Sequence, residues 1–354
     1  MFTGKKVLIT GGSGSWGQEL TRQLLKYYNP AEIRIYSRSE PKQVEMAHRF
    51  KTPNIKFMIG DVRDKERLLQ CLKGVDYVFH MAALKHVPVC EVNTREAVLT
   101  NIMGTQNVIE AAIDNNVKKV IFVSTDKACD PLNLYGTTKA VAEKLIISAN
   151  LLESNTAFTC IRGGNVLGTA WSVVPLFRQQ IRLNNEITLT DASMTRFFMT
   201  LEEAIGLLFR AAEVSIGGEI FVIKMDGVKI TDLSEVMVKE LGDSKTKIRT
   251  IGIRPGEKID EVLVSRYEAP RTVEDGRYFV ILPHIDLPRI ESYYSNRPKV
   301  KFTEFNSRNT RILNKTGIKN LLQKDGWFGD LRIDPLISKL TAEDLKFVGK
   351  NKHL

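Results

Sequence analysis

The 354-residue chain lacks several features that would assign it to particular protein classes. It has only four cysteines, and they are scattered, without the close pairs of a zinc site or redox motif: Cys71, Cys90, Cys129 and Cys160. No apolar run approaches the roughly 20 residues needed to cross a bilayer. The opening residues MFTGKKVLIT also lack the apolar stretch and cleavage site of a signal peptide. We therefore expect free thiols, no metal, no membrane insertion and a cytoplasmic location.

Acidic side chains are fewer than basic ones. The chain has 51 lysines and arginines against 41 aspartates and glutamates, which gives a formal charge of +10 and a pI of about 9.3. This balance favours anionic partners such as nucleotides and phosphates. The basic residues are spread along the chain, however, and we find no basic patch interleaved with aromatics. A nucleic acid is therefore not an expected partner.

The first half of the chain alternates short apolar runs with longer amphipathic stretches. The runs are KVLIT, EIRIYS, IKFMIGD, VDYVFHMAA, KKVIFVST and AFTCIR. Such alternation predicts an α/β fold, a Rossmann-type doubly wound parallel sheet with helices on both faces. After Arg162 the alternation weakens, and a smaller lobe that includes a helix at LEEAIGLLFRAAE is expected.

The expected domains follow from this change of pattern. We place the sheet domain at residues 1–165, the smaller lobe at 166–300 and a carboxy-terminal extension at 301–354. The boundary is soft, because the stretches GGEIFVIK and ITDLSEVMVKEL within the lobe could return to pack on the sheet domain.

A glycine-rich turn, TGGSGSWG, directly follows the first expected strand and opens a helix. Its glycines at positions 11, 14 and 17 permit a tight turn, close approach of the backbone to a pyrophosphate and tight packing of helix on sheet. In this context a dinucleotide site is favoured over a plain glycine turn. We expect cofactor contacts from Gly11, Ser13, Gly14, Ser15, Trp16 and Gly17.

The ends of later strands supply the other expected cofactor contacts. The second strand ends in Ser37 and Arg38 rather than in the acid typical of NAD sites, and an arginine fork suits a ribose phosphate. We therefore expect NADP, with NAD left open because Glu40 is close. Asn101 is a polar position in an apolar helical pattern, for which packing and cofactor contact are both open. The further expected contacts are Asp61, Val62, Ala82, Ala83 and Asn101.

The stretch STDKACDPLNLYGTTK holds the most reactive side chains of the sequence. Tyr135 and Lys139 lie one helical turn apart, so their side chains share a face. A lysine ammonium near a phenol favours the phenolate, which makes tyrosine a usable base near neutral pH. The pair follows the fifth strand, at the carboxyl edge where open sheets bind ligands. This position indicates catalysis rather than a chance match.

These residues resemble those of the extended short-chain dehydrogenase/reductases, through TGGSGSWG, Asp61-Val62, Ser124-Thr125, Tyr135 and Lys139. Within that superfamily the chain resembles the bacterial UDP-N-acetylglucosamine 4,6-dehydratases, through STDKACDPLNLYGTTK, AALKHVP, RGGNVLG, SVVPLF, MTRFFMTLEEA and RPGEK. The match spans roughly residues 2 to 270 and reappears in FNSRNTRIL. It implies a short, soluble, homo-oligomeric form without the amino-terminal membrane region of longer relatives.

The resemblance implies a role for each reactive residue. Tyr135, assisted by Lys139 and Thr125, takes the hydroxyl proton while hydride leaves carbon 4 of the sugar for the nicotinamide. A neutral Lys127 then removes the proton on carbon 5, and a protonated Asp126 gives a proton to the hydroxyl departing from carbon 6. Hydride returns to carbon 6, so the cofactor stays bound. Dehydratases of other nucleotide sugars typically carry glutamate in place of Lys127. Inversion or retention at carbon 5 stays open.

The resemblance also implies contacts for UDP-N-acetylglucosamine. Thr190 resembles the uracil-side position, Arg196 a diphosphate ligand, and Arg254 and Glu257 the ribose and phosphate contacts. The remaining expected substrate contacts are Lys85, Asn165 and Val174. Lys85, Tyr135 and Lys139 are expected to contact the cofactor as well. Where relatives commonly read SRGSVVP, this chain has TAWSVVP from Thr169, so the geometry of the sugar loop is in question.

Two other functions remain open at this point. A nucleotide-sugar 4-epimerase or reductase of the same superfamily would need neither a base for carbon 5 nor an acid for carbon 6, so it does not account for Asp126 and Lys127. A non-catalytic NADP-sensing regulator on a Rossmann scaffold would need no reactive pair at all, and fold alone does not exclude it.

Overall fold

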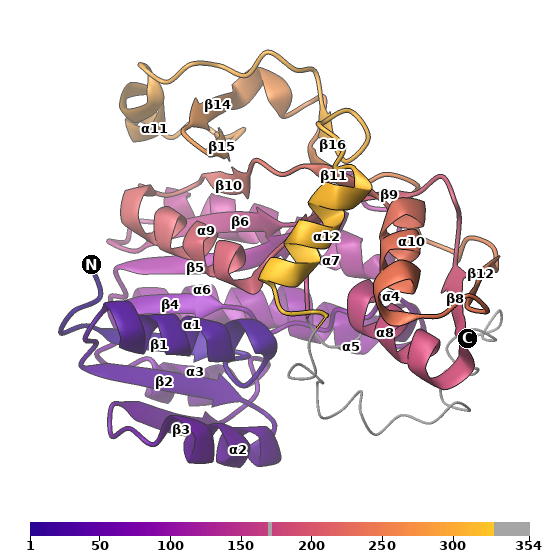
Figure 1. Cartoon of the computed structure of the whole chain (residues 1–354). Coiled ribbons are helices and arrows are strands. Elements are labelled where there is room, and N and C mark those ends of the chain that lie inside the picture. The colour runs from indigo at the N-terminus through magenta and orange to yellow at the C-terminus, as the bar shows by residue number, and fades with distance from the viewer. Residues whose placement is uncertain (169–171, 329–354) are drawn as a thin grey trace. The chain divides into compact units, whose positions relative to one another are not determined.

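The structure is a computed structural model, and it describes residues 1–168 and 172–328 (Figure 1). The chain forms two compact units, each assembled from separate stretches. Unit 1 comprises Met1–Gly163, Glu202–Lys224 and Leu263–Glu304, and unit 2 contains the described residues of the remaining stretches. The expected segments 1–165, 166–300 and 301–354 are continuous in sequence, whereas these units are not. Those segment boundaries stay a prediction.

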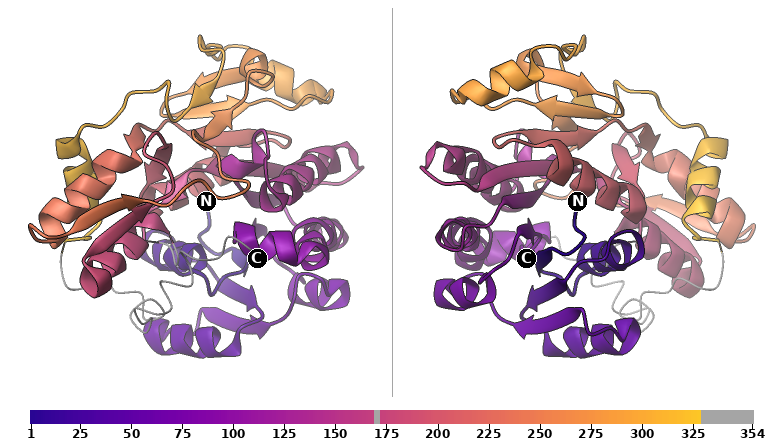
Figure 2. Two further views of the ribbon diagram at one scale, coloured as in Figure 1. Left: turned by 90° about the vertical axis from the view of Figure 1, so that its right-hand side faces the viewer. Right: turned by 90° about the vertical axis from the view of Figure 1, so that its left-hand side faces the viewer.

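Unit 1 is built on a nine-stranded sheet in the order β14-β15-β10-β6-β5-β4-β1-β2-β3. Strands β1 to β6 and β10 pair in parallel, and β15 and β14 add an antiparallel edge. This order, with helices on both faces (Figure 2), is that of a doubly wound sheet, so the predicted Rossmann-type fold is confirmed. The strands are β1 (Lys6–Thr10), β2 (Glu32–Ser37), β3 (Ile55–Ile59), β4 (Tyr77–His80), β5 (Lys119–Thr125), β6 (Ala157–Gly163), β10 (Ile220–Ile223), β14 (Thr272–Asp275) and β15 (Tyr278–Ile281).

The helices of unit 1 follow the amphipathic stretches between these strands. They are α1 (Ser15–Tyr27), α2 (Glu40–Phe50), α3 (Lys65–Cys71), α4 (Val87–Val92), α5 (Thr94–Val98), α6 (Gly104–Asp114), α7 (Leu134–Ser148), α9 (Leu201–Val214) and α11 (Pro288–Tyr294). Four short turns complete the unit: a π-helical turn η1 (Leu99–Met103) and the 3₁₀ turns η2 (Asp126–Ala128), η3 (Ala149–Leu151) and η4 (Ala269–Arg271).

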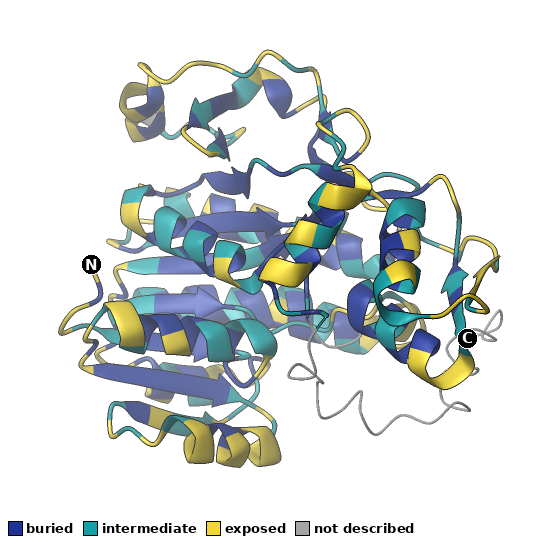
Figure 3. Cartoon of the chain, in the orientation of Figure 1, coloured by how far each residue is buried: buried dark blue, intermediate teal, exposed yellow. Residues whose placement is uncertain are grey.

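Burial in unit 1 is concentrated in the strands and in the helix faces turned toward them (Figure 3). Leu20 and Leu24 of α1 are fully buried, as the apolar spacing of that helix requires. Helix α7 differs, because its buried positions include the charged residues Lys139 and Glu143. Buried charges are tolerated only where they are paired or hydrogen-bonded. Lys139 and Glu143 therefore require compensating groups within unit 1.

The described residues of unit 2 form an apolar core and two small sheets. One sheet joins β7 (Asn165–Val166), β9 (Thr195–Met199) and β11 (Gly227–Lys229), and the other joins β8 (Glu186–Leu189) and β12 (Lys247–Thr250). Helices α8 (Val173–Asn184), α10 (Ile230–Leu241) and α12 (Lys315–Lys324) contribute Phe177, Met237 and Leu322 to the core. Short strands β13 (Val262–Val264) and β16 (Phe305–Asn306) lie where the chain passes between the stretches of the two units.

Several local predictions can be compared with these elements. LEEAIGLLFRAAE forms helix α9 as predicted, and GGEIFVIK returns to the large sheet as β10. ITDLSEVMVKEL does not return, because it forms α10 within unit 2. The four cysteines are buried free thiols, as expected. Among the described residues, none of the helices is long and apolar enough to span a membrane. The departure at Thr169, Ala170 and Trp171 lies outside the described residues.

Candidate active site at the carboxyl edge of the large sheet

The glycine turn between β1 and α1 forms a cradle that side chains would fill. Gly11 has φ +66°, and a Cβ there would stand 2.9 Å from the backbone nitrogen of Ala82. A Cβ on Gly17 would stand 2.3 Å from the carbonyl oxygen of Gly12. Gly14 is the N-cap of α1 and provides no side-chain cap, so the first amides of the helix are left for an anion. These features fit a dinucleotide pyrophosphate.

The predicted ribose contacts lie at the end of β2. The Ser37 hydroxyl accepts hydrogen bonds from the hydroxyl of Ser13 and from Gln43 Nε2, both at 2.9 Å. Arg38 keeps 55% of its side chain exposed, and its Nη1 is 3.9 Å from Asp61 Oδ2. The structure therefore brings Ser13, Ser37 and Arg38 to one corner of the glycine cradle, with the guanidinium open to a ligand.

Asp61, which follows β3, already has a partner. Arg63 donates to its Oδ2 through Nε at 2.9 Å and Nη2 at 2.6 Å. Burial acts to raise the pKa of Asp61, but the hydrogen bonds from Arg63 outweigh it and lower that pKa. An adenine amino group would have to share this carboxylate with Arg63. Val62 is buried, and both predicted adenine contacts stay predictions.

Thr10 and His80 form a buried pair that holds the chain at the end of β4, and sequence reasoning did not identify it. Thr10 Oγ1 accepts from the backbone nitrogens of Met81 and Ala82 at 3.1 and 3.2 Å, and lies 2.7 Å from His80 Nδ1. Burial, followed by the charge of Lys139, lowers the pKa of His80 to about 3, so the imidazole is neutral. The pair fixes Ala82, whose backbone faces Gly11. No motif in the sequence separates this histidine from an ordinary core residue.

Asn101 lies in the π-helical turn η1 and bridges two parts of the site. Its Oδ1 accepts from the backbone nitrogen of Leu84 at 2.8 Å, while its Nδ2 donates to the Leu84 carbonyl and to Thr138 Oγ1, both at 2.9 Å. The amide thus ties the loop after β4 to helix α7. Packing and cofactor contact were both open for Asn101. These hydrogen bonds show the packing role, and the cofactor contact stays a prediction. Ala83 and the exposed Lys85 lie on the same loop.

The reactive stretch folds as a tight turn against the start of α7. Strand β5 ends at Thr125 and turns through η2, and Asn133 then caps α7 by accepting from the backbone nitrogen of Gly136 at 2.8 Å. A Cβ on Gly136 would stand 2.1 Å from the carbonyl oxygen of Lys127. Only glycine at this position lets the helix pack this closely on the turn.

Asp126 is the most buried acid of the turn. Its Oδ1 accepts from Thr125 Oγ1 at 2.8 Å and from Lys127 Nζ at 3.1 Å. Its side chain is only 2% exposed, against 26% for Lys127, so the pair is not a solvated surface ion pair. Asp126 Oδ2 is buried without a hydrogen-bond partner among the described residues. This oxygen is available to a substrate group.

Tyr135 and Lys139 lie on α7 as predicted, but the electrostatics differ from the expectation. Lys139 is 2% exposed, its Nζ is 3.7 Å from the centre of the Phe122 ring, and burial lowers its pKa to about 7. Burial raises the pKa of Tyr135 to about 12, against the opposing charge of Lys127 and the hydrogen bond with Thr125. The expected lowering of the phenol pKa is therefore not found in this structure, because burial exceeds the lowering effects of Lys127 and Thr125.

The remaining predicted substrate residues all belong to unit 2. Asn165 donates to the Phe197 carbonyl at 3.2 Å, and the Thr190 hydroxyl contacts Met194 Sδ at 3.2 Å. Val174 is fully buried in the core of the unit, which gives its side chain a packing role. Arg254 and Glu257 face each other across a turn, with the Arg254 backbone nitrogen 3.3 Å from Glu257 Oε2.

Arg196 is engaged by its own unit. Its Nη1 donates to the carbonyl oxygens of Thr195 and Ile259 at 2.7 and 2.8 Å, and its Nη2 to that of Lys258 at 2.9 Å. These bonds occupy donors that a diphosphate would need. The predicted diphosphate contact stays a prediction, and the bonds that are present hold the chain segment after RPGE in place.

The stretch FNSRNTRIL has a structural role beside Arg196. The Ser307 hydroxyl lies 2.6 Å from Thr195 Oγ1 and accepts from the backbone nitrogen of Glu261 at 2.9 Å. Arg308 donates to Asp260 Oδ2 at 2.6 Å and to the Ser193 carbonyl at 2.7 Å. The stretch thus ties the amino-terminal end of β9 to the segment at Asp260 and Glu261, a role that sequence reasoning did not identify.

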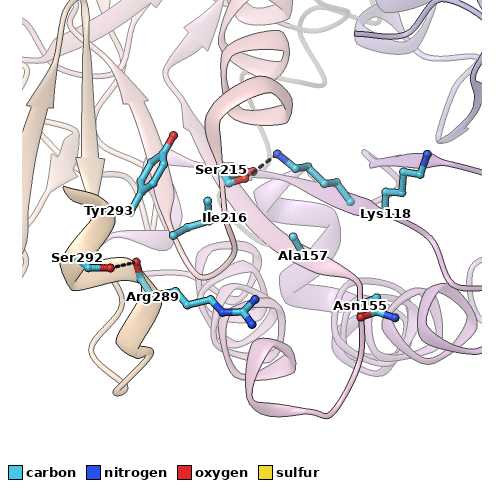
Figure 4. Close-up of a pocket in the computed structure, with 9 residues that line it drawn as sticks. Lys118, Asn155, Ala157, Ser215, Ile216, Arg289, Ser292 and Tyr293 are labelled. Atoms are coloured by element: carbon cyan, nitrogen blue, oxygen red, sulfur yellow. Dashed lines mark hydrogen bonds between the residues drawn. The ribbon is translucent and has the colours of Figure 1, made fainter.

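A cavity of about 570 Å³ lies at the opposite, amino-terminal edge of strands β5 and β6 (Figure 4). Its lysines are already engaged: Lys118 pairs with Asp76 at 2.9 Å, and Lys119 donates to the carbonyl oxygens of Ala212 and Ser215. None of the predicted site residues lines this cavity. The candidate active site is therefore the carboxyl edge, where the glycine cradle and the Asp126 turn lie.

The sequence matches a known protein family over most of its length. Residues 7–283 match the family described as polysaccharide biosynthesis protein, which covers most of the chain and all of the carboxyl-edge residues described above. The chain belongs to this polysaccharide biosynthesis family.

Within the polysaccharide biosynthesis family, relatives carry two kinds of name. Two UDP-N-acetylglucosamine 4,6-dehydratases (inverting) of Campylobacter jejuni are 43% and 46% identical, over 92% and 83% of the chain and 92% and 88% of the relatives. A UDP-glucose 4-epimerase of Rickettsia bellii is 43% identical over 91% of the chain and 96% of its own length. The predicted relationship to UDP-N-acetylglucosamine 4,6-dehydratases is confirmed, and with it the class of enzyme.

Solved structures support the fold of this family member. Pen from Bacillus thuringiensis is 42% identical, with a TM-score of 0.87 over 92% of the chain and 99% of that structure. DesIV, a dTDP-glucose 4,6-dehydratase from Streptomyces venezuelae with NAD bound, has a TM-score of 0.67 over 92% of the chain and 98% of that structure. At 21% identity this second likeness shows the shared fold alone.

Proposed function

We propose that this protein is a UDP-N-acetylglucosamine 4,6-dehydratase that inverts carbon 5 and uses NADP, and that its product enters surface-glycan synthesis. The observation that carries the proposal is the buried Asp126, bonded to Lys127, in the turn that packs on the Tyr135 helix. Elimination of water across carbons 5 and 6 needs a base and an acid close together. This turn supplies one of each, and inversion follows the names of the Campylobacter jejuni relatives.

The Asp126–Lys127 pair can reach the reactive protonation state without gaining or losing a proton. Transfer of one proton from Lys127 Nζ to Asp126 Oδ1, along the 3.1 Å hydrogen bond, turns the ion pair into a neutral amine and a carboxylic acid. The low dielectric of a buried site disfavours separated charges, which favours this neutral form once a substrate excludes water. Lys127 then accepts the carbon 5 proton, and Asp126 donates to the departing hydroxyl.

Tyr135 is the base for the preceding oxidation. A bound nicotinamide dinucleotide supplies the hydride acceptor and later the hydride donor of the reaction. Because burial holds the pKa of Tyr135 near 12, the phenol must lose its proton in a more positive site. The Lys139 ammonium and a nicotinamide cation would both favour the phenolate. Thr125 lies next to both steps, because its hydroxyl donates to Asp126 Oδ1 and also acts to lower the pKa of Tyr135.

A 4-epimerase is the alternative that the Rickettsia relatives raise. Epimerisation oxidises and reduces carbon 4 alone, so it uses a base such as Tyr135 but leaves Asp126 and Lys127 without a task. We therefore favour dehydration. UDP as the nucleotide, the unit 2 contacts Asn165, Thr190, Arg196, Arg254 and Glu257, a cytoplasmic location and a homo-oligomeric state remain predictions of the same proposal.

Mass spectrometry of the product tests the proposal directly. Purified protein incubated with UDP-N-acetylglucosamine is expected to yield a nucleotide sugar lighter by one water molecule. An epimerase would yield a product of unchanged mass. A product of unchanged mass, or no turnover of this substrate, would contradict the proposed dehydration.

The cofactor preference is tested at Arg38, whose exposed guanidinium lies beside the glycine cradle. We expect Arg38→Ala to weaken NADP binding by about 10- to 100-fold, the worth of a charge-assisted hydrogen bond of about 1.5–3 kcal/mol. NAD binding should change little, and Arg49→Ala, on the exposed surface of α2, is the matched control. The two affinities can be measured by calorimetry on protein stripped of bound dinucleotide. Equal losses for both dinucleotides would contradict the assignment of Arg38 to a ribose phosphate.

A further inference from the structure

A buried cluster of three charged side chains lies in unit 1 behind the reactive residues. Arg162 donates to Glu143 through Nε at 2.9 Å and Nη2 at 2.7 Å. It also donates to Glu268 through Nη1 and Nη2, both at 2.8 Å. Their side chains are only 4%, 4% and 11% exposed for Arg162, Glu143 and Glu268. One guanidinium thus binds two carboxylates, and Arg271 lies on the other side of Glu268, with its Nη2 3.6 Å from Glu268 Oε1.

The position of this cluster connects it to helix α7. Arg162 lies in β6 directly beside Ser124 of β5, just before the reactive turn. Glu143 lies on α7 one helical turn beyond Lys139, so the two side chains share a face of the helix. The Glu143 carboxylate is therefore the acidic group of this cluster that shares a helix face with the buried Lys139 ammonium.

The other groups that face Lys139 carry no negative charge. His80 of β4 is neutral, because burial lowers its pKa to about 3. Cys160 of β6 is a neutral thiol, because burial raises its pKa well above the ordinary value. The Phe122 ring of β5 offers only its π face, at 3.7 Å. Glu143 is thus the carboxylate that these elements place beside the ammonium.

We propose that Glu143, held by Arg162 and backed by Glu268, is a positioning residue that keeps Lys139 protonated for the oxidation step. The role in the oxidation step rests on the proposed function, whereas the effect of Glu143 on the pKa of Lys139 does not. Burial alone drives the pKa of Lys139 down, and Glu143 is the strongest influence that raises it, leaving the value about 7. Glu268 binds Arg162 on the far side and is paired with Arg271 as well, so its charge acts on those two arginines.

The chain offers a matched pair of variants for this idea. Glu143→Gln and Glu268→Gln each remove one charge from the cluster and keep the shape of the side chain. Each leaves Arg162 paired with the other carboxylate, so both variants are expected to fold. Only Glu143→Gln removes the anion that lies next to Lys139.

Titration of lysine labelled with ¹³C at Cε, followed by NMR, tests the proposal without substrate. The Lys139 signal is identified by its absence in Lys139→Met. We expect it to titrate near pH 7 in the native protein and about one pH unit lower in Glu143→Gln. Glu268→Gln should move it much less. An unchanged midpoint in Glu143→Gln, or equal shifts in both variants, would overturn the proposal whatever the enzyme's substrate.

The pH dependence of turnover gives a second, separate outcome. If the oxidation step needs the Lys139 ammonium, the alkaline limb of kcat/KM moves to lower pH in Glu143→Gln by the same amount as the NMR midpoint. A shifted NMR midpoint with an unmoved limb would refute the role in oxidation while leaving the proposed dehydration intact. If thermal melting shows that Glu143→Gln is unfolded, Glu143→Asp replaces it. This variant keeps the negative charge but moves it one methylene farther from Lys139, so we expect a smaller downward shift of the Lys139 midpoint. An unshifted midpoint would count against the proposal.

Discussion

Lys127→Ala is expected to lower dehydration of UDP-N-acetylglucosamine by about 10²–10⁴-fold, the range typical of a lost general base. The variant keeps Tyr135 and Lys139, so reversible oxidation at carbon 4 should continue and bound dinucleotide should be retained. The carbon 5 proton should no longer exchange with solvent, because the variant lacks the amine that removes it. Turnover is measured by NMR, and the bound dinucleotide by chromatography of the denatured protein.

Lys144→Ala is the matched control for this variant. Lys144 lies on the exposed surface of the same helix, α7, so its loss removes a lysine charge without touching the turn. It should keep native turnover. Native turnover in Lys127→Ala would refute the assignment of Lys127 as the base. Loss of bound dinucleotide in that variant would instead indicate a role in cofactor binding.

Gly136→Ala is expected to abolish measurable turnover and to destabilise the protein. The added Cβ would stand 2.1 Å from the carbonyl oxygen of Lys127, a backbone atom that cannot move without shifting the reactive turn. Overpacking of this kind costs about 1–3 kcal/mol of unfolding free energy. Calorimetric melting measures the destabilisation, and the product assay measures turnover.

Gly206→Ala separates this steric effect from the general effect of alanine in a helix. Gly206 lies within α9 and has nothing within 4 Å of an added Cβ. Because alanine favours helix, this control should stabilise the protein by up to about 1 kcal/mol and leave turnover unchanged. If Gly136→Ala behaved like Gly206→Ala, the close approach of α7 to the Lys127 carbonyl would have no functional importance.

The large sheet could be predicted because the sequence patterns of its strands and helices are local. Six apolar runs separated by helical stretches define a parallel sheet, and such a sheet gathers the ends of its strands at one edge. The discontinuous make-up of the units was harder to predict. GGEIFVIK and ITDLSEVMVKEL lie close together in the sequence, yet the first becomes β10 of the large sheet and the second becomes α10 of unit 2. That choice depends on long-range packing, which the pattern of either stretch does not contain.

The site could be predicted where neighbours in sequence are neighbours in space. Gly11 to Gly17 and Asp126 to Lys139 each form one local turn, and the structure places both at the carboxyl edge. The electrostatics could not be predicted in this way. The pKa of Tyr135 depends on its burial, and Glu143 reaches its role only through Arg162 and Glu268, which come from other parts of the chain.

The most direct test of dehydration follows the native protein with UDP-N-acetylglucosamine in heavy water by NMR. If Asp126 and Lys127 perform the elimination, the spectrum should show a new methyl group at carbon 6, a ketone at carbon 4 and deuterium at carbon 5. The coupling constants should report inversion at carbon 5. Formation of the galacto epimer, with the hydroxyl still on carbon 6 and hydrogen still on carbon 5, would contradict the account.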